Sequence, residues 1–269
     1  MATDDVTAYR EAACEAARRG GAVLEKWRSR FQVREKGHCD LVTDADLDSQ
    51  RTIYSFLHER FPDHAFLGEE EGASKSRPAA DAPPTWICDP LDGTTNYVHD
   101  CPLYCVSLGL QVAGELVVGV VFDPRQNEMF VAAKGQGAWL GSRPLRTSTA
   151  TTLEESLLAT GFPPDMRGQE RSLDWWRYFS FRAQSLRRTG STALNLAYLA
   201  AGRFDGYWAF DNRVWDVAGG VVLVREAGGI ITNVDGTPFD PYTPDSIASN
   251  GPLHPLLLEA LRSDPHRSS

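Results

Sequence analysis

The sequence predicts a mixed α/β and α+β fold, in which helices and sheets are stacked in layers and the chain forms two halves. The first half combines two helical segments with a run of short β-rich segments, whereas the second half alternates strands and helices. A chain of 269 residues with 42% hydrophobic content can bury a substantial core. We therefore expect one compact unit with an N-terminal half over residues 1–148 and a C-terminal half over 149–269.

Two helices are predicted at the start of the first half. From about Val6 to Arg30 the sequence is rich in alanine and carries apolar residues at helical spacing, and residues 3–5 offer side-chain oxygens for an N-cap. Thr43 is suited to cap a second helix, which we expect over Asp44–Arg60. Asp46 then falls in the first turn of this second helix.

Strands are predicted to follow a surface loop. Residues 72–84 are rich in Ser, Ala, Pro and charge, which is typical of a loop, and Thr85–Cys88 is β-branched and aromatic enough for a buried strand. Residues 104–145 then contain β-rich runs separated by Gly- and Asn-containing turns, which indicates an antiparallel meander. Its three clearest strands are Val106–Val112, Glu115–Phe122 and Glu128–Ala133.

The second half alternates strand-like and helix-like segments. We expect a strand at Ser156–Thr160, an aromatic helix at about Asp174–Ala183 and a helix that starts near Ser191. The pattern continues with a strand at 207–210, a helix at 215–227, strands at 230–232 and 246–249, and a last helix at 254–262. In the aromatic helix, packing explains Trp175 and Trp176 better than ligand stacking does.

Composition excludes several classes of protein. A formal net charge of -9 and a pI near 5.2 argue against a partner bound through nucleic-acid phosphates, because such proteins carry a basic face. The pair Arg187-Arg188 is too small a basic cluster for that role. The sequence has no leader-like start and no apolar run of membrane-spanning length, so we expect no membrane association and a cytoplasmic location. Its five cysteines are scattered through helix-like and strand-like segments, as fits a reducing compartment: Cys14, Cys39, Cys88, Cys101 and Cys105.

The segment Asp89-Pro90-Leu91-Asp92-Gly93-Thr94 carries the strongest chemical signal. It places two carboxylates three residues apart where a buried strand is expected to stop, and Gly93 permits a close approach of the backbone. Magnesium takes oxygen ligands and is usually held by a few carboxylates together with substrate phosphate. At an effective dielectric constant near 20, two carboxylates about 4 Å apart repel by roughly 4 kcal/mol. The segment therefore predicts a site for hard cations beside a phosphate.

Three further carboxylates lie at the ends of predicted elements: Asp46, Glu69 and Asp216. An isolated Asp or Glu is usually a solvated surface residue, so none of the three is informative alone. A solvated or packing role is also the default for Lys36 and His99. Ser107 lacks a histidine partner at an informative spacing, which argues against a serine nucleophile.

Taken in order along the chain, these motifs resemble the inositol monophosphatase family. The resemblance rests on Asp46, Gly68-Glu69-Glu70, Asp89–Thr94, Trp215-Asp216-Val217-Ala218-Gly219 and Glu226-Ala227-Gly228-Gly229. It implies the layered α/β/α/β/α sandwich of the inositol monophosphatase and fructose-1,6-bisphosphatase type. It also implies a magnesium-dependent, lithium-sensitive homodimer that acts on a small phosphorylated metabolite.

The resemblance assigns roles to particular residues. Two or three Mg²⁺ ions would be held by Glu69, Asp89, the backbone carbonyl of Leu91, Asp92 and Asp216. Water would be activated near Glu69 and Thr94, with Asp46 supporting Thr94, and no covalent phosphoenzyme is required. If Gly93 and Thr94 open a helix, their N–H groups would hold the phosphate, while Thr95 and Asn96 cap or orient that helix.

Substrate recognition is expected at two places. The family's Gly-Thr/Ser-Ala stretch is matched by Gly190-Ser191-Thr192, in which Thr192 is larger than the usual alanine. Relatives that prefer inositol phosphates carry an acidic residue seven positions before the Trp-Asp aspartate, where this chain has Ala209. Sugar hydroxyls then need another partner, and we expect Arg213 or Asn212 to help select a substrate other than plain inositol phosphate.

Two alternatives stay open. A magnesium phosphatase for histidinol phosphate or a sugar (bis)phosphate shares the same chemistry. A regulatory or scaffolding protein that retains the fold belongs to another class, and degenerate metal ligands would favour it. All the expected ligands are present, which favours the enzyme.

Overall fold

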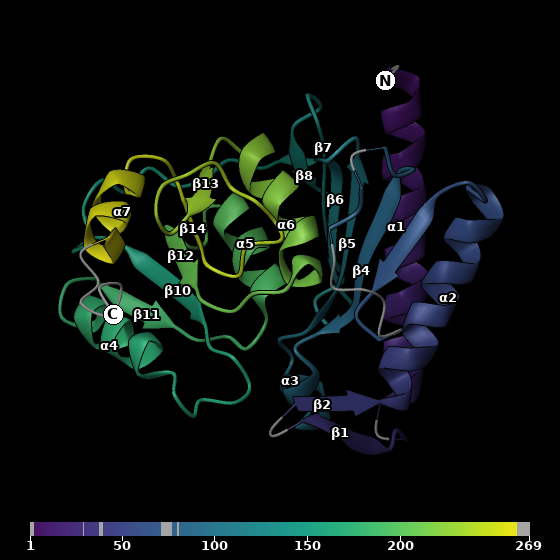
Figure 1. Cartoon of the computed structure of the whole chain (residues 1–269), viewed down its shortest axis with the longest axis horizontal. Coiled ribbons are helices and arrows are strands. Elements are labelled where there is room, and N and C mark those ends of the chain that lie inside the picture. The colour runs from purple at the N-terminus through teal and green to yellow at the C-terminus, as the bar shows by residue number, and fades with distance from the viewer. Residues whose placement is uncertain (1–2, 29, 38–39, 71–76, 80, 263–269) are drawn as a thin grey trace.

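The computed structural model describes residues 3–28, 30–37, 40–70, 77–79 and 81–262. Helices and sheets alternate in five layers, as predicted (Figure 1). Helices α1 (Thr3–Trp27) and α2 (Asp44–Arg60) cover one face of a seven-stranded sheet, and α5 (Thr192–Ala200) and α6 (Val214–Glu226) cover the other. A five-stranded sheet forms the next layer, and α4 (Glu170–Ser180) and α7 (His254–Arg262) form the outermost one. None of the helices in the described residues is long and apolar enough to cross a membrane.

The seven-stranded sheet contains the predicted meander. Its order is β3-β4-β5-β6-β7-β8-β9, in which β3 and β4 are parallel and the other neighbours are antiparallel. The bounds are β3 (Ala65–Gly68), β4 (Thr85–Asp92), β5 (Cys105–Val112), β6 (Glu115–Asp123), β7 (Glu128–Ala133), β8 (Ala138–Leu140) and β9 (Arg143–Pro144). The strand β3 and the hairpin of β1 (Val33–Gly37) and β2 (Asp40–Thr43) were not predicted. Lys36 lies in β1 rather than in a loop, and its side chain is outside the described part.

The five-stranded sheet has the order β11-β10-β12-β14-β13 and mixes parallel with antiparallel pairs. Its strands are β10 (Leu157–Gly161), β11 (Ser185–Arg187), β12 (Gly206–Ala209), β13 (Ile230–Asn233) and β14 (Ser246–Ser249). On its outer side, Trp175 and Phe179 of α4 pack with Trp208 of β12, and the ring centroids of Phe179 and Trp208 are 4.6 Å apart. This confirms a packing role for Trp175.

Helix α6 lies between the two sheets and is buried along almost its whole length. A glycine pair makes this position possible. A Cβ atom at Gly219 would stand 2.8 Å from the Val120 carbonyl oxygen of β6, and one at Gly220 would stand 2.5 Å from the Leu196 side chain of α5. Because any side chain at these positions would push the layers apart, the two glycines set the depth at which α6 enters the core.

Local signals predicted α2 well. The helix runs over Asp44–Arg60, as expected, and Thr43 and Asp46 form a capping box at its start. Helix α1 ends at Trp27, a few residues before the predicted end, and the predicted N-cap side chains at residues 3–5 lie outside the described part. The described cysteines form no disulfide, and Cys39 is outside the described residues.

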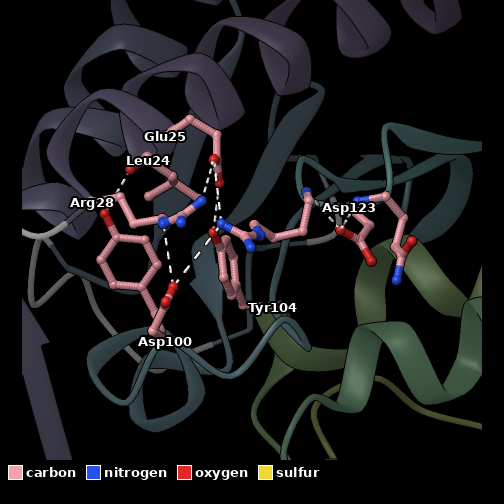
Figure 2. Close-up of polar contacts among 9 residues, drawn as sticks. Leu24, Glu25, Arg28, Asp100, Tyr104 and Asp123 are labelled. Carbon is pink, nitrogen blue, oxygen red and sulfur yellow. Dashed lines mark hydrogen bonds and ion pairs between the residues drawn. The ribbon is translucent and has the colours of Figure 1, made fainter.

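A polar cluster joins the end of α1 to the short helix α3 (Thr94–Val98) and to the turn after β6 (Figure 2). The Tyr104 hydroxyl donates to a Glu25 carboxylate oxygen over 2.5 Å, and Arg28 lies 3.2 Å from the Asp100 carboxylate. The Tyr97 hydroxyl of α3 donates to the Leu24 carbonyl over 2.6 Å. These bonds tie α3 to α1.

Asp123 ends β6 beside this cluster and is fully buried (Figure 2). Its Oδ1 accepts from the backbone N–H groups of Arg125 and Gln126 at 2.8 and 2.9 Å, whereas Oδ2 has no hydrogen-bond partner among the described residues. Burial raises the pKa of Asp123 to about 6, although the hydrogen bond from the Gln126 N–H stabilises the charged form. The folded protein therefore holds a proton on Asp123 at a pH at which the unfolded chain has released it.

Asp123 should make the fold less stable as the pH rises. The folded-state pKa lies above the unfolded value, so its stabilising contribution is complete below about pH 4 and is lost as the pH passes about 6. Relative to Asp123→Asn, the wild-type free energy of unfolding should fall by about 1–3 kcal/mol between pH 4 and pH 7. Urea unfolding of both proteins across this range measures the difference, and parallel curves would contradict the assignment.

Candidate active site

A cleft of about 340 Å³ is lined by residues from two stretches of the chain, 40–96 and 161–216. The end of β4, the start of α3, the loop before α5 and the start of α6 all reach it. Its lining contains every predicted metal-ligand residue and most of the predicted substrate residues. The residues that line it are Asp40, Leu41, Glu69, Asp89, Leu91, Asp92, Gly93, Thr94, Thr95, Asn96, Gly161, Phe162, Pro164, Arg188, Gly190, Ser191, Thr192 and Asp216.

The two carboxylates of the central motif lie inside β4, rather than after its end as predicted. The strand continues through Asp92 because its pairing with β5 resumes there after an irregularity that follows Asp89. Asp89 is 2% exposed and Asp92 is 8% exposed, so both charges are withdrawn from water. The Leu91 N–H donates to Asp89 Oδ1 over 3.0 Å. The bulge thus presents both carboxylates to the cleft while the strand stays paired.

Gly93 makes the turn from β4 into α3. Its φ of 99° lies in the left-handed region, and a Cβ atom there would stand 2.8 Å from the Leu103 carbonyl oxygen. Helix α3 begins at the next residue, as the prediction for Gly93 and Thr94 required. Asn96 fixes the helix from the other side, because its amide nitrogen donates to the carbonyls of Leu103 at 2.6 Å and Thr189 at 2.8 Å. This confirms an orienting role for Asn96.

Thr94 and Asp46 are brought together from elements 48 residues apart. The Thr94 hydroxyl lies 3.2 Å from Asp46 Oδ1 and 3.1 Å from the Leu91 carbonyl oxygen. The other Asp46 oxygen accepts from the N–H and the hydroxyl of Thr43, at 2.9 and 2.6 Å. Because these bonds hold Asp46 at the N-terminal turn of α2, its carboxylate fixes the orientation of the Thr94 hydroxyl.

Glu69 is positioned by the sheet. Its backbone N–H donates to the Cys88 carbonyl over 3.1 Å, which extends the pairing of β3 with β4 and sets Glu69 beside Asp89. The next residue, Glu70, donates its N–H to the Gln50 side chain over 3.1 Å. The Gly-Glu-Glu motif is therefore the end of a short parallel strand.

Asp92 lies against the N-terminus of α5. Its Oδ2 accepts from the Ser191 hydroxyl at 2.7 Å and from the Ala193 N–H at 2.5 Å, and Oδ1 lies 3.3 Å from the Thr192 nitrogen. Ser191 is also the N-cap of α5 and accepts from the Leu194 N–H. The predicted substrate-binding stretch is thus bonded directly to a predicted metal ligand.

Asp216 enters the cleft from the first turn of α6, where its Oδ2 accepts from the Arg213 N–H over 2.7 Å. Asp46, Asp92 and Asp216 thus each accept a hydrogen bond from a backbone N–H at the N-terminus of a helix. The partial positive charge at such a terminus stabilises a carboxylate.

Burial and mutual repulsion disfavour the charged forms of these carboxylates. Burial raises the pKa of Asp89 well above its ordinary range, and the charges of Glu69, Asp92 and Asp216 add to the effect. Burial likewise raises the pKa of Asp216, followed by the charge of Asp92. Burial raises the pKa of Asp92 to about 6, although the bond from Ser191 acts in the opposite direction. A bound cation would relieve this repulsion.

The donor set fits magnesium. In the described part of the chain, no three Asp, Glu, His or Cys side chains form a preassembled set of ligands for one ion. Magnesium does not require such a set, because it keeps several waters and is usually bound by one or two carboxylates together with substrate phosphate. The mutually repelling carboxylates of the cleft supply oxygen donors of this kind.

Other predicted residues lie outside the cleft lining. Arg213 borders a neighbouring pocket of about 150 Å³, where its guanidinium is 3.8 Å from Asp211, so its substrate role stays a prediction. Ala209 is buried in β12. His99 is exposed, and the buried Ser107 hydroxyl is 3.5 Å from the Trp215 carbonyl oxygen.

Several cleft residues were not predicted, notably Phe162, Pro164, Arg188 and the β2 residues Asp40 and Leu41. None of them belongs to a recognisable motif. Arg188 was noted only as half of a small basic pair, and the available signal was its position two residues before Gly190.

Comparison with known proteins identifies the family to which the chain is similar. Residues 5–266 match the model of the inositol monophosphatase family. An inositol-1-monophosphatase of Synechocystis is 41% identical over 97% of this chain and 91% of its own. The Nus factor SuhB of Salmonella typhimurium is 36% identical over 94% of this chain and 95% of its own. The crystal structure of the extragenic suppressor protein suhB from Bartonella henselae superposes with a TM-score of 0.88, at 36% identity over 95% of this chain and 99% of that one.

The chain is a phosphoric monoester hydrolase, the class to which its curated inositol-1-monophosphatase relatives belong. The chain belongs to the inositol monophosphatase family.

Ser191→Ala should destabilise the protein by about 1–2 kcal/mol, because it removes both the N-cap of α5 and a bond to the buried Asp92 carboxylate. Urea unfolding measures the loss. Ser180→Ala serves as a control, since the exposed Ser180 hydroxyl only donates to the Trp176 carbonyl within α4. Equal effects of the two substitutions would contradict the special role of Ser191.

Proposed function

We propose that the chain hydrolyses a small phosphate monoester with magnesium and an activated water, in the manner of an inositol-1-monophosphatase. The observation that carries the proposal is the convergence of Glu69, Asp89, Asp92 and Asp216 on one cleft beside the bonded pair of Thr94 and Asp46. Mutually repelling carboxylates are of little use to a protein unless they bind cations, and a phosphate monoester supplies the remaining anionic ligands.

The proposed reaction gives separate roles to several residues of the site. Two or three Mg²⁺ ions would be held by Glu69, Asp89, the Leu91 carbonyl, Asp92 and Asp216. When bound, magnesium supplies positive charge that stabilises the attacking and leaving oxygens of an in-line displacement and lowers the pKa of water. Thr94 Oγ1 donates to Asp46 and can therefore accept a hydrogen bond from the attacking water, which orients it. Glu69 stands on the same cleft wall to receive the proton that the water loses.

The start of α3 is suited to hold the phosphate. Gly93 and Thr94 line the cleft, and the first N–H groups of a helix have no partners within it. On our proposal these groups donate to the phosphate oxygens, while Gly190, Ser191 and Thr192 border the alcohol portion of the substrate. No step requires a covalent bond between enzyme and phosphate.

The wall around the alcohol portion differs from that expected of an inositol-selective enzyme. Position 209 carries alanine, and the nearby Thr192 hydroxyl is 3.1 Å from the Tyr207 hydroxyl. Tyr207 in turn lies 3.3 Å from the Asn212 side-chain oxygen. Histidinol phosphate and sugar (bis)phosphates are thus alternative substrates to inositol 1-phosphate.

A second candidate function follows from one relative. The Nus factor SuhB of Salmonella typhimurium carries a name that refers to regulation rather than to hydrolysis. If this chain had a regulatory or scaffolding role, substitution of the metal ligands would not change the binding of its partner.

We also infer from the family resemblance that the protein is cytoplasmic, homodimeric and inhibited by lithium.

Asp89→Asn should abolish magnesium-dependent phosphate release, with a loss of roughly a thousandfold or more in kcat, because it removes a charged metal ligand. The fold should persist, since the substitution also removes the cost of burying a repelled charge. Phosphate release and circular dichroism measure the two effects.

Asp63→Asn, at an exposed position after α2, is the matched control and should keep full activity. Near-normal turnover of Asp89→Asn would refute the metal assignment.

Substrate profiling tests the hypothesis that alanine at position 209 removes selectivity for inositol 1-phosphate. Inositol 1-phosphate, histidinol phosphate and sugar phosphates should be hydrolysed without a strong preference for inositol 1-phosphate, because alanine cannot bond its ring hydroxyls. Values of kcat/KM measure the preference. Ala209→Glu should shift it towards inositol 1-phosphate, and a wild-type enzyme selective for that substrate would contradict the interpretation.

A further inference from the structure

The active-site cleft contains a basic side chain to which the proposed chemistry gives no role. Among the described residues that line the cleft, Arg188 is the only Lys or Arg, and it faces a set of five acidic residues: Asp40, Glu69, Asp89, Asp92 and Asp216. Arg188 follows β11, and Phe162 and Pro164, which follow β10, share its part of the lining.

The Arg188 guanidinium is supported but not neutralised. It lies over the Phe162 ring, 5.1 Å from the centroid, and Phe162 in turn packs edge-on against Trp176 of α4 with centroids 5.9 Å apart. Within the described part of the chain, no carboxylate pairs with Arg188 and no carbonyl accepts from it. Its neighbour Arg187 differs, because it donates to the Ser185 hydroxyl at 2.7 Å and to the Leu186 carbonyl at 2.8 Å. The donors of Arg188 are therefore free to meet a ligand.

Gly161, which directly precedes Phe162 in the cleft lining, is closely surrounded by other side chains. A Cβ atom at Gly161 would stand 3.1 Å from the Tyr207 hydroxyl, 3.3 Å from Thr192 Oγ1 and 3.5 Å from the Ala209 Cβ. The space directly beside Gly161 is thus filled by two hydroxyl groups and a methyl group. The free charged donor next to it belongs to Arg188, at the exposed end of the cleft.

We propose that Arg188 determines substrate specificity by binding a second anionic group on the alcohol portion of the substrate. The substrate class is then a phosphate monoester that also carries a carboxylate or a further phosphate. A planar guanidinium bonds either group with two parallel hydrogen bonds. An anion placed elsewhere along the acidic lining would be repelled, so Arg188 fixes both the presence and the position of the second charge. This inference rests on the proposed phosphatase function.

Two matched substrate pairs test the inference. Glycerol 3-phosphate is compared with 3-phosphoglycerate, which adds a carboxylate, and glucose 1-phosphate with glucose 1,6-bisphosphate, which adds a phosphate. In magnesium at low salt, Arg188→Ala should lower kcat/KM for the member with the second anion by about 10- to 100-fold, the range of a charge-assisted hydrogen bond. It should change kcat/KM for the other member by less than about twofold. The effect should shrink as salt screens this exposed side chain.

Arg188→Lys and Arg187→Ala complete the experiment. The lysine variant keeps the charge without the planar donors, so it should recover part of the discrimination. Arg187→Ala removes the same charge one residue away and should leave the discrimination intact. Circular dichroism establishes that each variant is folded.

Different results would contradict the role of Arg188 and the phosphatase function. An equal loss for both members of a pair, or an equal effect of Arg187→Ala, would overturn the role of Arg188 while leaving the phosphatase function in place. If the folded wild-type protein in magnesium hydrolysed none of the four esters and neither inositol 1-phosphate nor histidinol phosphate, the proposed function would fail, and the role of Arg188 with it.

Discussion

The structure depends on one electrostatic constraint, which is that several carboxylates must be held close together and away from water. Burial alone raises the pKa values of Asp89 and Asp216, and each charge makes the others less favourable. The fold partly offsets this cost by directing helix N-termini at the same region. Asp46 lies in the first turn of α2, Asp216 in the first turn of α6, and Asp92 accepts from the N-terminal residues of α5. The repulsion between carboxylates that the helix N-termini do not offset favours the binding of cations.

The layered architecture brings these helix ends together. Helix α6 can deliver Asp216 to the cleft because Gly219 and Gly220 let it pack closely between the sheets. Asn96 ties α3 to the loop before α5, and Tyr97 ties it to α1. The helix that begins with Thr94 is therefore held from both halves of the molecule. Displacement of either layer would move the Thr94 hydroxyl relative to the carboxylates, and catalysis is sensitive to shifts of this kind.

Holding the carboxylates in place and selecting a substrate make different demands on the cleft. The carboxylates are fixed by buried bonds on strands and helix termini, whereas Arg188 and Phe162 follow strand ends and Arg188 is exposed. A rigid, acidic floor with an exchangeable outer wall allows the same phosphate chemistry to serve different alcohols. In this chain the outer wall carries a cation where a polyol-binding site would need acceptors.

The sequence by itself determined the features that depend on neighbours along the chain. The capping box of Thr43 and Asp46 specifies α2 to the residue, and Asp89–Thr94 predicts a site for cations and phosphate before any contact is known. The family motifs extend this to the layered fold and to Glu69 and Asp216. The short strands β1, β2 and β3 escaped prediction because they have four or five residues and form through pairing with other segments.

Only the tertiary structure decided which residues line the cleft. The sequence pointed to Arg213 rather than to Arg188, yet Arg188 lines the cleft while Arg213 lies near Asp211 in a neighbouring pocket. The bulge that keeps Asp89 and Asp92 within β4 likewise depends on pairing with β5. A cap or a metal-binding motif acts over a few residues and can be recognised locally. The wall of the cleft is assembled from segments far apart in the chain, so its members are known only once the layers are packed.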